Sequence, residues 1–183
     1  MNITVYTEST PNPATMKFIV NKLLINGSVD FATKESAEES AFAKELYKFN
    51  FVNGVFFASN FVTVTKVEDA DWKDIEPILK EFVKGAVESE LPLQQTVTEE
   101  NLIFEGTETE IKIQQILNDY VRPAVEQDGG AISYKSFDDG IVTVELRGSC
   151  SGCPSSTITL KSGIQSLLQR MVPEVKEVVS EAM

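Results

Sequence analysis

The run CSGCP at residues 150–154 constrains the fold more than any other stretch, because it places two thiols in a short loop before a helix start. Proline suits the first position of a helix, where its missing N–H would have had no partner. Val142, Val144 and Leu146 alternate with polar residues just upstream and predict a strand with one buried face. We therefore expect a strand, a cysteine loop and a helix in succession.

Cys150 and Cys153 are the only cysteines, and the sequence contains no histidine. A helix N-terminus favours negative charge, so both thiols are expected to favour the thiolate form, which binds soft metals or attacks disulfides. A closed four-coordinate metal site needs four ligands. The other two must therefore come from a second copy of the chain or from another molecule, and a four-thiolate site requires a dimer with its cysteine loops face to face.

The spacing alone leaves two other kinds of site open. Cys150 could be the attacking thiolate and Cys153 the resolving thiol of a dithiol/disulfide oxidoreductase. The pair could also hold zinc in a bridged structural dimer. We see no parallel βαβ pattern around the pair, which argues against the oxidoreductase. If the site instead binds a metal cluster and transfers it to another protein, the cysteines should be exposed rather than buried.

Composition excludes several classes of partner. The formal net charge is −12, so a nucleic-acid or anionic-membrane surface, which needs clustered Lys and Arg, is not expected. No apolar run approaches the roughly 20 residues that span a bilayer. The first residues have neither a basic nor an apolar leader region, so we expect no signal peptide and a cytosolic protein.

Residues 1–88 predict one small α+β domain without a catalytic constellation. Ser36 and Glu39 have the spacing of a capping box and predict a helix over residues 37–49. Asp71 is a suitable N-cap for a second helix. Strands are expected at residues 3–7, 16–20 and 23–25, and a hairpin at residues 52–58 and 61–66 with its turn at Ser59-Asn60.

Residues 89–108 are polar and irregular and predict a linker, and residues 109–183 predict a second small α+β domain. A helix is expected over residues 109–127, with a change of geometry at Pro123. Glycine after Asp128 can end that helix. A strand from Ile132, a turn at residues 138–140, the cysteine loop, a helix to about Met171 and a short last strand follow.

These motifs resemble the NifU-like family, the Nfu-type iron–sulfur cluster scaffolds and carriers, over nearly the whole chain except the linker. In the second half the resemblance rests on DGG at residues 128–130, GSCSGCPSS at 148–156 and TLKSGI at 159–164. In the first half it rests on TPNP at residues 10–13, GVFF at 54–57 and FVTVTK at 61–66, typical of the N-terminal domain of these proteins. One departure is Ala131, where the family often has aspartate.

The resemblance implies a carrier rather than an enzyme. It implies a 4Fe-4S cluster shared between two chains, held by Cys150 and Cys153 of each, and passed to apo iron–sulfur client proteins after delivery from a cluster-assembly scaffold. The partners expected from it are therefore these proteins and a second copy of the chain, with no nucleic acid and no membrane. Because residues 1–88 contain no cysteine, that domain should bind no cluster; selection of clients there is a family-level expectation.

Overall fold

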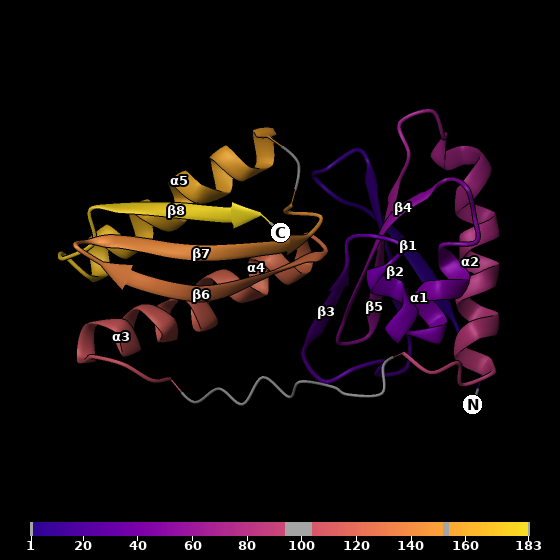
Figure 1. The fold of residues 1–183 in the computed structure, drawn as a ribbon, viewed down its shortest axis with the longest axis horizontal. Helices are drawn as coiled ribbons and strands as arrows, with labels where there is room; N and C mark the ends of the chain where they lie inside the picture. Colours follow the sequence, from indigo (N-terminus) through magenta and orange to yellow (C-terminus); the bar gives the residue numbers. More distant parts are fainter. Residues whose placement is uncertain (1, 94–103, 152–153, 183) are drawn as a thin grey trace. The chain divides into compact units, whose positions relative to one another are not determined.

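The chain folds into two compact units, Met1–Glu100 and Asn101–Met183, each of which combines helices with one β-sheet. A computed structural model describes residues 2–93, 104–151 and 154–182 (Figure 1). The prediction of two small α+β domains is confirmed. The central part of the expected linker, residues 94–103, lies outside the described residues.

The first unit is built on a five-stranded antiparallel sheet with the strand order β1-β2-β5-β4-β3. β4 and β5 form the predicted hairpin, and Ser59 in its turn adopts a positive φ of 48°. β1 and β3 are the two edge strands. The bounds are β1 (Val5–Ser9), β2 (Thr15–Val20), β3 (Ser28–Phe31), β4 (Val52–Ala58) and β5 (Phe61–Lys66).

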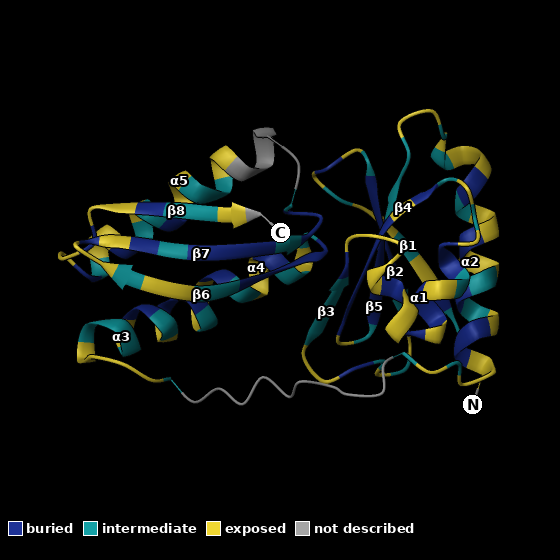
Figure 2. Cartoon of the chain, viewed as in Figure 1, coloured by how far each residue is buried: buried dark blue, intermediate teal, exposed yellow. Residues whose placement is uncertain are grey.

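Two helices, α1 (Ala41–Leu46) and α2 (Trp72–Glu88), share a hydrophobic core with the sheet. The predicted cap of α2 is confirmed, because the Asp71 side chain accepts a hydrogen bond of 3.0 Å from the N–H of Lys73. Leu79 of α2 is fully buried in this core. The dark blue strands of Figure 2 show how much of the sheet is buried.

Two predictions for the first unit are wrong. Ser36 does not cap a long helix: its hydroxyl donates to the carbonyl of Thr33, and residues 36–39 form the short 3-10 helix η1 (Ser36–Glu39). Ser40 caps α1 instead, accepting from the N–H of Ala43 at 3.2 Å. Leu23–Ile25 is not a strand, because the N–H groups of Leu24 and Ile25 both donate to the carbonyl of Ser59 in the β4–β5 turn rather than to a ladder.

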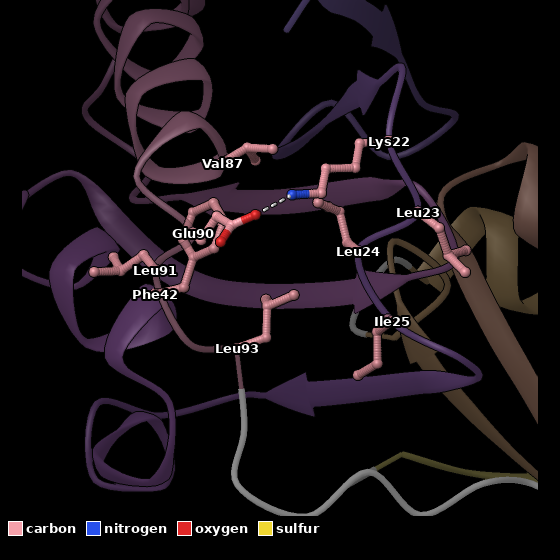
Figure 3. A pocket seen from close by; sticks show the side chains of 9 residues that line it. All are labelled: Lys22, Leu23, Leu24, Ile25, Phe42, Val87, Glu90, Leu91 and Leu93. Carbon is pink, nitrogen blue, oxygen red and sulfur yellow. Dashed lines mark hydrogen bonds and ion pairs between the residues drawn. The ribbon is translucent and has the colours of Figure 1, made fainter. Parts of the chain in front are cut away.

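The chain beyond α2 continues to pack on the first unit. The N–H of Phe42 donates to the carbonyl of Pro92 at 3.0 Å, and Leu91 and Leu93 lie against the core. These residues border a groove of about 300 Å³ that also contains the 3.1 Å ion pair of Lys22 with Glu90 (Figure 3). The start of the expected linker is therefore an ordered part of this unit.

The second unit begins with a helical run that changes geometry before Pro123, as predicted. A capping box opens it, in which Thr107 accepts from the N–H of Glu110 and Glu110 accepts from the N–H of Thr107. The middle of the run is one π-helical turn, and proline stands in the first turn of the last piece. The pieces are α3 (Glu108–Ile116), η2 (Leu117–Val121) and α4 (Arg122–Gln127).

The sheet of the second unit has three strands in the order β6-β7-β8: β6 (Gly130–Asp138), β7 (Ile141–Gly148) and β8 (Glu177–Ala182). β6 and β7 form an antiparallel hairpin, but β7 and β8 are parallel and are joined through α5 (Pro154–Met171). The expectation of no parallel βαβ pattern around the cysteines is therefore wrong. Topology does not separate a cluster carrier from a dithiol oxidoreductase.

The second core lies between one face of this sheet and its helices. Val142, Val144 and Leu146 point into it, as their alternation predicts. Ile158 of α5, expected to supply an apolar contact, is 66% exposed instead. Within the described ranges, no helix combines the length and the hydropathy that a membrane span requires.

Candidate functional site

Cys150 lies two residues beyond the end of β7, in the connection that leads to α5. Pro154 is the first residue of α5, as predicted. Cys153, the second predicted ligand, lies outside the described residues, as does Gly152. The structure therefore shows how the first half of the cysteine loop is held.

Gly148 turns the chain out of β7 into the loop. Its φ is 69°, in the left-handed region where glycine carries no Cβ penalty. The Gly148 carbonyl then accepts two hydrogen bonds from Ser151, at 3.1 Å from the N–H and at 2.8 Å from the hydroxyl. These bonds close a tight turn around Cys150 and fix its backbone.

Ser149 ties the same turn to the end of α4. Its N–H donates to the carbonyl of Gly129 at 3.3 Å, and its hydroxyl donates to the carbonyl of Asp128. Gly129 has a φ of 82° and ends the helix, as the sequence predicts. The Asp-Gly-Gly run thus supplies the carbonyl groups to which the cysteine loop is anchored.

Gly130 stands directly against the cysteine. It pairs with Gly148 in the β6–β7 ladder. A Cβ added to Gly130 would lie 2.8 Å from the Cys150 sulfur and 2.6 Å from the carbonyl oxygen of Arg147. The second distance is to backbone, which cannot move aside easily. A side chain at Gly130 would therefore force the cysteine turn away from β6.

Cys150 is only 6% exposed and belongs to the second unit's core, together with residues such as Leu146. The Ser149 hydroxyl lies 3.9 Å from its sulfur. The expectation of an exposed site is therefore wrong for this residue. The physical reason is the tight turn at Gly148, which directs the residue after Ser149 back toward the core rather than into solvent.

Charged residues near the loop lie on the opposite face of β7 from the core and contact neighbouring strands. The Arg147 guanidinium donates to the hydroxyl of Ser133 at 2.5 Å, and Glu145 forms a 3.3 Å ion pair with Lys135. Ala131, which replaces the expected aspartate, is buried and pairs with Arg147 in the ladder. Among the residues that the structure describes, no three His, Cys, Asp or Glu side chains gather as a metal site.

The sequence alone did not reveal that Ser149 and Gly130 position the cysteine. The glycine pair is interpretable from sequence as a helix end, and this interpretation is right for Gly129. The second glycine exceeds what a helix end needs. An extra glycine at a strand start is a signal of close approach by another backbone or side chain, and here that neighbour is Cys150.

Comparison with known proteins places both units in one family. The NifU-like domain matches residues 113–179, and the N-terminal domain of the scaffold protein Nfu/NifU matches residues 5–90. The chain is 42% identical over 178 residues to the human NFU1 iron-sulfur cluster scaffold homolog, mitochondrial, covering 95% of this chain and 70% of that protein. The chain belongs to the NifU-like family of Nfu type.

Two further relatives agree. NifU-like protein 4, mitochondrial, of Arabidopsis thaliana is 42% identical over 97% of this chain and 65% of its own length. The NFU1 iron-sulfur cluster scaffold homolog, mitochondrial, of Drosophila erecta is 37% identical over 95% of this chain and 63% of its own length. The chain thus spans about two thirds of the length of the curated relatives that it matches.

These names correct one prediction and agree with another. Each relative is described as mitochondrial, which contradicts the expectation of a cytosolic protein. The family description is that of a scaffold protein rather than a catalyst, which is consistent with the expectation that the chain is not an enzyme.

Proposed function

We propose that this protein is a scaffold and carrier that assembles a 4Fe-4S cluster between two chains and transfers it to apo iron–sulfur proteins. Membership of the Nfu-type family carries the proposal, together with the cysteine pair that the family's scaffold motif contains. Cys150 and Cys153 of each chain are the proposed ligands. The cluster is cargo in this account, and the chain is not a catalyst.

The ligand count supports sharing between two chains. The sequence has two cysteines and no histidine, so one chain offers two soft ligands. Iron–sulfur clusters of this type are held by four thiolates. Two chains that bring their cysteine loops together complete the set. Separation of the chains then removes half of the ligands, which gives a simple route for delivery.

Burial of Cys150 adds a step to loading. With 6% of its surface exposed, the sulfur must turn out of the core before it can reach a cluster shared with another chain. The Ser149 hydrogen bonds to the Asp128 and Gly129 carbonyls hold the turn closed. We infer that opening this turn precedes cluster binding. The apo-protein would then keep its thiol shielded from oxidation until it is loaded.

The test is anaerobic reconstitution with iron and sulfide, followed by iron and sulfide analysis and by absorption and EPR spectra. We expect about two iron atoms per chain, one four-iron cluster for two chains, and loss of bound iron in Cys150→Ser and in Cys153→Ser. Ser166→Ala, an exposed change on the same helix α5, is the matched control and should retain full iron. Intact cluster binding in either cysteine variant would contradict the proposal.

The same samples separate the other two candidates for the pair. A zinc-bridged dimer would contain zinc and no iron in protein isolated without reconstitution. A dithiol oxidoreductase would reduce a disulfide substrate as a metal-free monomer, with loss of this activity in Cys150→Ser. No observation in the described structure favours either of these functions over the carrier.

A further inference from the structure

The first unit has an open sheet edge next to a groove. Among residues 2–93, 104–151 and 154–182, β1 pairs only with β2, so its other side is the edge of the sheet. The N–H of Asn21 donates to the carbonyl of Thr4, which fixes the alternation along the strand. The main-chain groups of Val5, Thr7 and Ser9 therefore point away from β2, and they have no hydrogen-bond partner among the described residues.

This edge lacks the usual protection against strand pairing. In natural proteins, short strands, charged side chains, prolines or bulges prevent an edge strand from pairing with another chain. β3, the opposite edge, has four residues with Asp30 among them, whereas β1 has five, with no proline and no bulge in its pairing with β2. The one charge of β1, Glu8, lies 3.9 Å from Lys17 on the neighbouring strand. The charge of α2 nearest the middle of β1 is Glu76, whose carboxylate accepts a hydrogen bond of 2.6 Å from the Thr7 hydroxyl.

A groove of about 440 Å³ lies beside the start of this edge, along residues 2–6, and α2 borders its far side; Thr7 and Ser9 continue the open edge beyond the groove. Residues 2–6 line one wall, and Pro77, Lys80, Glu81 and Lys84 line the other. Tyr6 is 63% exposed at the strand side. An extended segment laid against β1 would meet main-chain donors and acceptors on one side and helix side chains on the other.

Charge indicates what kind of segment fits. Lys80 and Lys84 are one helical turn apart, and no carboxylate of the described chain lies within 4.0 Å of either ammonium group. With Glu81, the groove carries a net charge of +1 (2 − 1), on a chain whose net charge is −12. The positive charge is confined to the groove beside residues 2–6, because Glu76, one helical turn before Lys80, lies at Thr7 outside the groove lining. A segment with a carboxylate opposite the two lysines would complement it.

We propose that the first unit binds an extended, acidic segment of a partner protein, which adds to the sheet as a strand beside β1. Strand addition draws affinity from main-chain hydrogen bonds and specificity from alternate side chains. Here the main chain of Val5, Thr7 and Ser9 supplies the hydrogen bonds, and Lys80 and Lys84 select the charge. This binding site needs no cluster, because the first unit contains no cysteine. A failure of the proposed cluster site would therefore leave the strand-binding proposal unaffected, and the reverse also holds.

The test uses a random dodecapeptide library displayed on phage and selected against the full chain carrying Cys150→Ser and Cys153→Ser. We expect recovered peptides to contain Asp or Glu among β-forming residues and to shift the amide resonances of Val5, Thr7 and Ser9. Recovery of no peptide, of peptides without acidic preference, or of peptides that shift other regions would overturn the proposal.

Two variants of the binding measurement test the mechanism. Lys80→Glu with Lys84→Glu should weaken the best peptide at least tenfold, whereas Lys73→Glu with Lys112→Glu, an equal change of charge outside the groove, should not. N-methylation of alternate peptide amides should weaken it similarly, because it removes the main-chain donors. Equal affinity of the methylated peptide, or self-association of the chain that the groove variant abolishes, would contradict binding of an acidic partner strand.

Discussion

Two polar loops of this molecule are held by similar hydrogen bonds but differ in the side chains that they contain. In the first unit, the loop between β1 and β2 is locked by Asn12, whose side chain accepts from the N–H of Ala14, and by the hydroxyl of Thr10, which donates to the Asn12 carbonyl. In the second unit, Ser149 and Ser151 lock the turn after β7 through main-chain carbonyls. Only the second loop contains a thiol.

The difference between the loops lies in what they place against the core. The Trp72 indole donates to the carbonyl of Pro13, so the first loop is tied to a helix and carries no group with metal or redox chemistry. The second loop presses Cys150 against Gly130 at the edge of a core. An ordered loop is thus not by itself a sign of chemistry. What distinguishes the second loop is the Cys150 thiol, together with a neighbouring position, Gly130, where any side chain would collide with the sulfur.

Leu79→Ala should have the largest effect on stability and none on the site. Leu79 is fully buried in the first core, and truncation of such a leucine costs about 3 kcal/mol. We expect that loss in the free energy of urea unfolding of the first unit, with unchanged iron content after reconstitution. Ile78→Ala, at a position 47% exposed on the same helix, should cost about 0.5 kcal/mol or less. Loss of iron in Leu79→Ala would contradict the expectation that the core of the first unit can be destabilised without affecting the cysteine site of the second.

Gly130→Ala should affect both stability and site. Its Cβ would meet the Arg147 carbonyl oxygen at 2.6 Å, and overpacking of this kind costs about 2 kcal/mol. We expect a lower free energy of unfolding of the second unit and reduced cluster occupancy. Gly163→Ala is the control, because no heavy atom lies within 4 Å of its Cβ position in α5, and it should add about 0.5–1 kcal/mol of stability. Full stability and occupancy in Gly130→Ala would show that the cysteine turn tolerates displacement.

Ser149→Ala tests whether the serine keeps the turn at Cys150 closed, with the thiol buried. Loss of its hydroxyl bond to the Asp128 carbonyl should cost about 1 kcal/mol, which corresponds to about fivefold more of the open turn. In a Cys153→Ser background, alkylation of Cys150 by iodoacetamide should accelerate by that factor. Ser151→Ala removes a hydroxyl bond within the turn but none to Asp128. Its alkylation rate, compared with that of Ser149→Ala, shows which of the two hydroxyl bonds limits opening of the turn. An unchanged alkylation rate in Ser149→Ala would mean that another contact limits opening.

Glu110→Gln should have the smallest effect. The N–H of Thr107, the Thr107 hydroxyl and the Tyr134 hydroxyl hold the pKa of Glu110 below its ordinary value. A lowered folded-state pKa gives stability that is present above the unfolded pKa and lost as pH falls through the folded pKa. The urea midpoint of the second unit should therefore drop less between pH 7 and pH 3 in the variant. An equal drop of the urea midpoint in Glu110→Gln and in the original chain would contradict this contribution of the capping box.

Local signals in the sequence predicted local structure well. The hairpin with its turn at Ser59 and the cap at Asp71 depend on neighbouring residues, and both are confirmed. The helix cap at Ser36 was wrong because Ser40, four residues later, is also a suitable cap and is the residue that caps α1. The parallel pairing of β8 with β7 depends on how the chain returns after α5, and no short motif encodes it.

The chemistry of the cysteine pair stays a prediction, and the setting of Cys150 could not be predicted from the sequence. Two cysteines without histidine indicate an incomplete soft-metal site from composition alone. Burial of Cys150 could not be predicted, because it results from the left-handed turn at Gly148 and from the space that Gly130 leaves across the ladder. Both are tertiary properties of a residue type that occurs ten times in the chain.

The most direct test of the central claim is the native mass of the protein with and without iron, measured in the same anaerobic preparation together with iron content. Loading should produce a species of two chains with one four-iron cluster, and removal of iron with a chelator should abolish this species. Cys150→Ser should never form it. A cluster that remains bound to a single chain after dilution would contradict a site completed by two chains.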